Sequence, residues 1–376
     1  GKTEREARRK AKQTLRDYED GLSRRDERLT VRDYLTDWLE TTAANRVRPS
    51  TLKNYRFHIN NHILPAIGGI QLRELTATDV NRMLAGIVNK GVSPATANLI
   101  RATLVNALSS AVKAQMVRSN AAALSDARRE KRTRIVPLTP EQARRLIEAT
   151  KDDRMGPLIA VAIATGLRQG ELLALRWQDV DLERRVLDVH RTLTWQKADE
   201  GSHRKRTPAF ADPKTAHSRR RVPLTQLAVE AFHRQREVVR EMEQAATVAS
   251  WRPIPGEDLV FVTTVGTPLD GTEVTHRLHR LLEGAGLPQK RFHDLRHSTA
   301  SFLLAEGADI FTVKEILGHS GISMTADIYG HLTEKLAEDA AARLDRVFAD
   351  AKTGRSAPKP TPDAIDSDDT ETGGDR

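Results

Sequence analysis

The sequence predicts a mainly α-helical protein with one small antiparallel β-sheet, in which an all-α N-terminal domain precedes an α+β C-terminal domain. Three observations along the 376-residue chain support this fold class. Four segments with helical periodicity follow one another in the N-terminal part. A charged stretch without apolar periodicity, "DARREKRTR" (126–134), then has the composition of an interdomain linker. Beyond it, further helical segments surround two short segments of alternating apolar and polar residues, which are typical of strands.

Residues 1–28 and 29–125 differ in apolar content. Residues 1–28 carry many charges and few apolar side chains, so we expect an exposed helix or linker there. Residues 29–125 contain the four helical segments, at 30–40, 49–68, 76–91 and 93–117. Residues that can cap a helix stand near three of their starts: Thr30 or Asp33, Thr76, and Ser93 followed by Pro94. We therefore expect a compact α-helical domain over 29–125.

Residues 135–348 are expected to form the second domain. Its predicted first helix starts at Thr139, where Gln142 completes a capping box. An apolar helix at 157–166 is expected to end at its glycine. Further helices are predicted at 224–247, 270–285, 293–307, 309–319 and 332–348. The domain is therefore mainly helical.

The β-sheet is predicted from two alternating segments, "RVLDVHRTL" (185–193) and "RRRVPL" (219–224). Between them lies a long basic insertion, from Trp195 to Asp212, which we expect to be a solvated loop. These two segments are short, so the expected sheet is small.

The charge balance of the chain suggests a polyanionic partner. Lysine and arginine outnumber aspartate and glutamate by 60 to 51, which gives a net charge of +9. The segment 349–376 is acidic and nearly free of apolar residues, so we expect a disordered tail and a folded part that is more basic still. Nucleic acid is the commonest partner of such a protein, although an ordinary charge-rich soluble protein would share the balance.

The composition also excludes several classes of site. The chain contains no cysteine, which excludes disulfides, cysteine-ligated zinc, iron–sulfur clusters and thiol catalysis. No apolar run approaches the roughly 20 residues that cross a bilayer, and the N-terminal residues lack the apolar core of a signal peptide. We therefore expect a soluble, cytoplasmic protein without a membrane partner.

The stretch "RFHDLRHSTA" (291–300) suggests two kinds of site. His293 and His297 would share one face of a helix, as in the zinc-binding pattern H-E-x-x-H, with Asp294 in place of the glutamate. However, Arg296 lies in the same turn, and a guanidinium is unfavourable beside a dication but can bind a phosphate through two parallel hydrogen bonds. The residues favour a phosphate clamp over a metal site, which would also need a third ligand.

Three further stretches carry candidate residues: "ATGLRQGELLALRWQDVDL" (164–182) with Arg168 and Glu171, "DPKTAHSRRRVPL" (212–224) with Lys214, and "LGHSGISMTADIYGH" (317–331) with His319 and Tyr329. Arg168 follows an apolar helix, where it could present an anion to the next helix N-terminus or be an ordinary surface arginine. Lys214 is expected near a β-hairpin tip, where most lysines face solvent. Glu171 is expected to be a structural partner of the backbone or of an arginine.

Together the four stretches contain the groups needed for phosphoryl transfer without a metal. Arginines and a histidine would neutralise the charge of a pentacoordinate phosphate. A tyrosine oxygen is a suitable nucleophile for a covalent phosphoester. A lysine can protonate the departing 5′-oxygen.

The chain resembles the tyrosine recombinases, or phage integrase family, over nearly its whole length. The matching strings occur in the family's order: "TGLRQGELLALRWQDVDL", "PKTAHSRRRVPL", "HDLRHSTAS" and "LGHSGISMTADIYGH". By this resemblance, 29–125 is the family's DNA-binding core-binding domain and 135–348 is its catalytic domain. The resemblance implies a site-specific recombinase that integrates or excises a phage or mobile element through a 3′-phosphotyrosyl intermediate.

The resemblance implies that three residues bind the scissile phosphate. Arg168 and Arg296 match the two arginines that clamp it, and His319 matches a third phosphate ligand. Glu171 falls on an acidic position beside the first arginine, where it is expected to support the shape of the site.

The remaining implied roles concern the nucleophile and proton transfer. Tyr329 matches the nucleophile, and His293 matches the histidine that assists proton transfer with it. Lys214 matches the general acid for the leaving 5′-hydroxyl. His297 is expected behind the site as a buried hydrogen-bonding residue, and no metal or other cofactor is expected.

The resemblance also implies partners. These are double-stranded DNA attachment sites, further copies of the chain in a homotetramer on two DNA sites, and an accessory DNA-bending or directionality protein. The helix at 333–348 either docks on a neighbouring subunit or caps its own domain. The implied location is the cytoplasm, in association with the nucleoid.

Two alternatives to a recombinase are considered. A type IB topoisomerase shares the tyrosine and its helpers but relaxes DNA without strand exchange between sites. A DNA-binding regulator with a vestigial site would bind DNA in a salt-dependent way without a covalent adduct. The complete set of six candidate catalytic residues favours an enzyme over a regulator.

Overall fold

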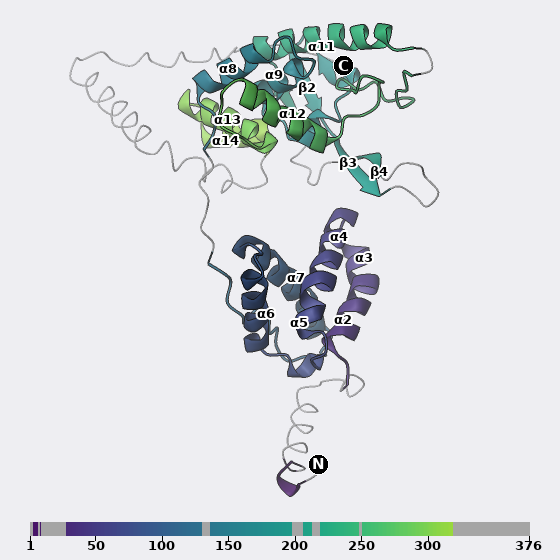
Figure 1. Cartoon of the computed structure of the whole chain (residues 1–376), viewed down its shortest axis with the longest axis vertical. Helices are drawn as coiled ribbons and strands as arrows, with labels where there is room; N and C mark the ends of the chain where they lie inside the picture. Colours follow the sequence, from purple (N-terminus) through teal and green to yellow (C-terminus); the bar gives the residue numbers. More distant parts are fainter. Residues whose placement is uncertain are drawn as a thin grey trace, which may run out of the picture. The chain divides into compact units, whose positions relative to one another are not determined.

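The structure is a computed structural model that describes residues 3–6, 8, 28–129, 136–197, 206–212, 219–247 and 250–318. The chain divides into two compact units, with the boundary between Thr133 and Arg134 (Figure 1). The predicted helix at 332–348, the predicted tail from residue 349 and most of the segment 1–28 lie outside the described residues.

Helices make up most of the N-terminal unit, as the periodicity predicts. They are α2 (Val31–Asp37), η2 (Trp38–Ala43), α3 (Ala44–Arg46), α4 (Pro49–His58), η3 (Ile59–Ile63), α5 (Leu64–Ile67), η4 (Leu72–Glu74), α6 (Ala77–Asn89) and α7 (Pro94–Lys113). The segments η2 and η3 are stretches of wider π-type turns within otherwise continuous helices. The four predicted helical segments are therefore confirmed.

Side chains at the helix starts explain where these helices begin. The Thr30 hydroxyl accepts a hydrogen bond from the backbone N–H of Asp33, and the Asp33 carboxylate accepts one from the backbone N–H of Thr30. Thr76 and Asp79 form the same reciprocal pair at α6, and Ser93 caps α7. Each pair satisfies N–H groups that have no partner within the helix.

The C-terminal unit combines helices and strands. Its helices are α8 (Pro140–Ala149), α9 (Gly156–Thr165), α10 (Gln169–Leu172), η5 (Trp177–Asp179), α11 (Gln226–Ala245), α12 (Gly271–Gly284), α13 (Phe292–Ala305) and α14 (Ile310–Leu317). Its strands are β1 (Val180–Asp181), β2 (Val186–Val189), β3 (Thr192–Lys197), β4 (Arg206–Ala211) and β5 (Arg220–Pro223). The apolar helix α9 is buried along most of its length and packs against α11 and α13. Within the described residues, no helix is both long and apolar enough to cross a membrane.

The predicted fold class, mainly α with a small antiparallel β component, is confirmed, but the strands form two antiparallel sheets in place of one. The first sheet has the order β1-β2-β5, and in it Val189 pairs with Arg220 while Asp188 pairs with Arg221. The second sheet consists of β3 and β4 alone (Figure 1). The segment predicted as one strand at 185–193 is therefore divided between the two sheets.

The insertion between Trp195 and Asp212, expected to be a loop, contributes to both strands of the second sheet. Among the described side chains of β3 and β4, only Leu193 is buried. The Arg191 guanidinium lies 4.6 Å from the centre of the Phe210 ring and covers part of the hairpin. The hairpin is thus held mainly by its backbone hydrogen bonds, and it lacks the apolar alternation by which a strand is recognised in a sequence.

Two glycines end the helices that lead to the candidate site. Gly166 follows α9 with a φ of 63°, and Gly318 follows α14 with a φ of 66°. Both lie in the left-handed region, which favours glycine. A Cβ at position 166 would collide with the Leu317 side chain and lie 3.3 Å from Cβ of Thr299. The end of α9 therefore packs closely against α13 and the last turn of α14.

This packing predicts that Gly166→Ala lowers the free energy of unfolding by about 2–4 kcal/mol, from the left-handed conformation and the overpacking together. Urea denaturation measures the change. The control is Gly284→Ala at the end of α12, where an added Cβ meets no atom within 4 Å. That change should be neutral or stabilise by up to about 1 kcal/mol. Equal effects at both positions would contradict the close packing at Gly166.

Candidate active site

Three arginines bind the last carbonyl oxygens of α14 and its C-cap, at 316–318. In each pair the guanidinium donates, and the pairs are Arg220 Nε with Ile316 (2.7 Å), Arg296 Nη2 with Leu317, and Arg168 Nη2 with Gly318 (2.6 Å). The last carbonyls of a helix have no partners within the helix, and they carry the negative end of its dipole. The end of α14 therefore stabilises three positive charges in one place.

One buried carboxylate, that of Glu171, joins two of these arginines. Its side chain is 3% exposed, and it accepts hydrogen bonds from Arg168 Nη1 at 2.7 Å and from Arg220 Nη2 at 3.0 Å. It also accepts from the backbone N–H of Arg168 at 3.0 Å, at the start of α10. Burial alone would raise the pKa of Glu171, but the hydrogen bonds and charges of Arg220 and Arg168 outweigh it and lower this pKa below its ordinary value. The carboxylate is therefore ionised at neutral pH.

The two arginines predicted to clamp a phosphate differ in exposure. Arg296, on α13, is only 1% exposed, and its Nη1 donates to the carbonyl oxygen of Gly166 at 2.8 Å. Burial and the positive charge of Arg168 lower the pKa of Arg296 to about 9, which leaves it charged at neutral pH. The Arg168 side chain is 31% exposed. Arg168 is therefore more accessible to a ligand, while Arg296 forms the floor of the cluster.

His293 lies on α13 one turn before Arg296, and part of its ring faces solvent. Partial burial, the neighbouring His297 and the charges of Arg296 and Arg168 lower the pKa of His293 to about 4. The ring is therefore neutral at neutral pH, and one of its nitrogens can accept a proton.

His297, expected to be a buried hydrogen-bonding residue, is only partly buried. Its ring lies perpendicular to that of His293, with 4.8 Å between the centroids. Its Nδ1 is buried and has no hydrogen-bond partner among the described residues. Nor does the described part of the chain contain a group of three or more His, Asp or Glu side chains arranged to hold a metal ion. Among the described residues, the two histidines therefore have no third ligand beside them of the kind that the zinc alternative needs.

Four of the seven predicted site residues come together in the structure: Arg168, Glu171, His293 and Arg296. The other three, Lys214, His319 and Tyr329, lie outside the described residues. His319 directly follows Gly318, whose carbonyl oxygen accepts from Arg168.

Arg220 is a member of the cluster that the sequence reasoning missed. It lies on β5 two residues before Val222, which is buried, so the alternation of a strand places both side chains on the inner face. That alternation could have shown that Arg220 faces inward, although not which groups it binds.

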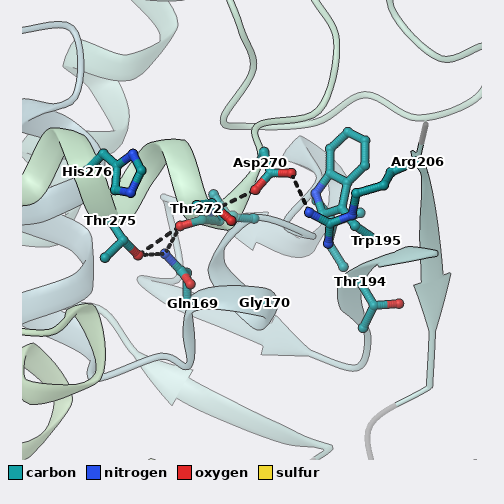
Figure 2. Close-up of a pocket in the computed structure, with 12 residues that line it drawn as sticks. Gln169, Gly170, Thr194, Trp195, Arg206, Asp270, Thr272, Thr275 and His276 are labelled. Atoms are coloured by element: carbon teal, nitrogen blue, oxygen red, sulfur yellow. Dashed lines mark hydrogen bonds and ion pairs between the residues drawn. The ribbon is translucent and has the colours of Figure 1, made fainter. Parts of the chain in front are cut away.

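A separate cavity of about 400 Å³ lies beside α10, but none of the four predicted site residues that the structure describes lines it. Figure 2 shows Gln169 reaching toward α12, where its Nε2 donates to the hydroxyl of Thr275 at 3.2 Å. The Arg206 guanidinium of β4 lies beside the Trp195 ring, and it pairs with the Asp270 carboxylate at 3.3 Å (Figure 2). Arg206 has one carboxylate to itself, whereas Arg168 and Arg220 share the single carboxylate of Glu171. The cluster at α14 therefore keeps more positive charge and fits a phosphate better.

Two protein-family models match the chain. The model described as "Phage integrase family" matches residues 137–335. The model described as "Phage integrase, N-terminal SAM-like domain" matches residues 30–86. The first match includes every candidate catalytic position.

Curated relatives match most of the chain. A protein named "Tyrosine recombinase XerC-like" from Caldanaerobacter subterraneus subsp. tengcongensis is 30% identical over 356 residues, which cover 93% of this chain and 91% of that protein. The integrase of Streptomyces ambofaciens is 30% identical over 357 residues, with 93% and 88% covered. The ICEBs1 integrase of Bacillus subtilis is 26% identical over 308 residues, with 79% and 78% covered.

Solved structures share the fold. The Tn1549 transposon integrase, in complex with a circular intermediate DNA, has a TM-score of 0.70 at 23% identity, with 84% of this chain and 99% of that chain covered. A lambda integrase tetramer bound to a Holliday junction has a TM-score of 0.56 at 19% identity, with 81% and 78% covered. Together with the family models and the curated relatives, these matches show that the chain belongs to the phage integrase family and is a tyrosine recombinase, an enzyme of site-specific DNA recombination.

Proposed function

We propose that this recombinase integrates or excises a mobile element by metal-independent strand cleavage, with Tyr329 as the nucleophile. The observation that carries the proposal is the arginine cluster at the end of α14. It gathers Arg168 and Arg296 around one carboxylate, beside a neutral His293 and directly before His319 in the chain. Preorganised positive groups of this kind stabilise the charge that develops on a phosphate in the transition state.

In the proposed reaction, Arg168, Arg296 and His319 bind the scissile phosphate. The Tyr329 oxygen attacks the phosphorus, and the bond to the 5′-oxygen breaks as a bond to tyrosine forms. Lys214 gives a proton to the departing 5′-oxygen, while His293 accepts the proton of the tyrosine hydroxyl. A 5′-hydroxyl from the partner duplex then attacks the 3′-phosphotyrosine, which releases Tyr329 and leaves a Holliday junction.

The proposed assembly is a homotetramer on two double-stranded DNA attachment sites. The lambda integrase tetramer on a Holliday junction supports this assembly by analogy. In the proposed homotetramer of this chain, the predicted helix at 333–348 would dock on a neighbouring subunit. An accessory DNA-bending or directionality protein would select between integration and excision.

The proposal predicts that the chain forms a covalent adduct with a nicked duplex that carries the sequence flanking its gene, in the presence of EDTA. The adduct should resist SDS, and peptide mapping should place it at Tyr329. Tyr329→Phe should bind the duplex as tightly as the wild type and form no adduct, because only the nucleophilic oxygen is removed.

Tight binding by the wild type without any adduct would instead support the DNA-binding regulator. An adduct with plasmid relaxation but no exchange between two sites would support the topoisomerase. An adduct that forms only after a divalent metal is added would contradict the metal-independent mechanism.

The low pKa of His293 predicts a pH dependence of stability. An unfolded histidine has a pKa of about 6.5, whereas that of His293 in the folded chain is about 4. Between these values the unfolded chain binds a proton that the folded chain does not, so stability falls as the pH decreases from about 6.5 to about 4. His293→Asn should weaken this dependence when urea denaturation is measured at pH 7 and pH 5. An unchanged dependence would show that His293 titrates normally and is not held neutral.

A further inference from the structure

Arg220 is a buried arginine that none of the proposed reaction steps uses. It lies on β5, and its side chain is 6% exposed. Its neighbour Arg221 points the other way, is 67% exposed and pairs with Asp188 on β2. Burial of a guanidinium is unfavourable unless its donors are satisfied, so the contacts of Arg220 need to be considered one by one.

The guanidinium of Arg220 joins two elements of the site. Its Nη2 and Nη1 donate to the two carboxylate oxygens of Glu171 on α10, at 3.0 Å and 3.3 Å. Its Nε donates to the carbonyl oxygen of Ile316 in the last turn of α14 at 2.7 Å. A planar fork can make all three bonds at once, whereas the ammonium of a lysine could not reproduce this geometry.

Arg168 binds the same two parts of the fold as Arg220, namely Glu171 on α10 and the C-terminal end of α14. The Glu171 carboxylate binds Arg168 Nη1, and the carbonyl oxygen of Gly318 binds Arg168 Nη2. Packing here is tight, because a Cβ at position 318 would lie 3.0 Å from Nη1 of Arg220. A shift of Arg220 would therefore displace both contacts that orient Arg168.

Charge gives Arg220 a second effect on Arg168. Glu171 divides its hydrogen bonds between the two arginines, so its one negative charge is shared by two positive ones. Without Arg220, the carboxylate would pair with Arg168 alone and would neutralise it more completely. The presence of Arg220 thus leaves more of the positive charge of Arg168 available to an anion.

We propose that Arg220 is a positioning residue for strand cleavage, which holds Glu171 and the end of α14 so that Arg168 is aimed at the scissile phosphate. The proposal rests on the function proposed above. Arg220 acts through Arg168 and does not itself touch DNA.

The test compares Arg220→Lys and Arg220→Met with the control Arg221→Met, which removes the same charge from the exposed face of the same strand. Three quantities are measured for each variant: thermal unfolding, the Kd for the duplex, and the single-turnover rate of cleavage at saturating enzyme. We expect Kd to stay within about threefold of the wild type. The cleavage rate should fall roughly tenfold for Arg220→Lys and roughly 100-fold for Arg220→Met, and the control should cleave at the wild-type rate.

A double-mutant cycle separates positioning from general destabilisation. If Arg220 acts through Arg168, combining Arg220→Lys with Arg168→Lys should slow cleavage little more than Arg168→Lys alone. Losses that multiply would show two independent effects and overturn the proposal. Should Arg220→Met fail to fold, the lysine variant decides, because it keeps the charge in the cluster.

The outcomes also distinguish this inference from the proposed function. A wild-type chain that forms no adduct would remove the proposed function and this inference with it. A wild-type chain that forms the adduct, together with Arg220→Lys and Arg220→Met variants that cleave at the wild-type rate, would overturn the role of Arg220 alone.

Discussion

The candidate site depends on one buried carboxylate, that of Glu171. It binds Arg168 and Arg220 and the backbone at the start of α10. Buried guanidinium groups are stable only when they are paired and hydrogen-bonded. Glu171 supplies the pairing, and the last carbonyl oxygens of α14 supply the further hydrogen bonds. Together they allow a cluster of positive charge to exist in a closely packed part of the protein.

The surrounding helices and strands supply the hydrogen-bond partners that these buried arginines need. Helix α14 must end where the arginines are, and Gly318 permits this through its left-handed conformation. Helix α9 must end beside the same arginines, and the left-handed conformation of Gly166 ends it there. The carbonyl oxygen of Gly166 then accepts a hydrogen bond from Arg296. The β1-β2-β5 sheet is placed so that the inner face of β5 contributes Arg220. The cluster is therefore assembled where the ends of α9 and α14 meet the strand β5, and not within a single loop.

Local signals in the sequence predicted most of the helices, because a capping pair such as Thr76 with Asp79 lies within one turn. Four site residues were also predicted to lie together, through the resemblance to a family. The β3–β4 sheet was missed because Leu193 alone supplies a buried side chain among those described. Arg220 was missed because its partners are distant in the chain, 49 residues away for Glu171 and 96 for Ile316. Pairings of that kind become visible only in the folded chain.

The central claim is that the charge of Glu171 organises the arginines, and Glu171→Gln tests it most directly because it keeps the shape and removes the charge. The account predicts a loss of roughly 3 kcal/mol in the free energy of unfolding, since buried positive charges lose their partner. It also predicts a single-turnover cleavage rate that is roughly 100-fold lower, since Arg168 is no longer held. Wild-type stability together with a wild-type cleavage rate would contradict the account.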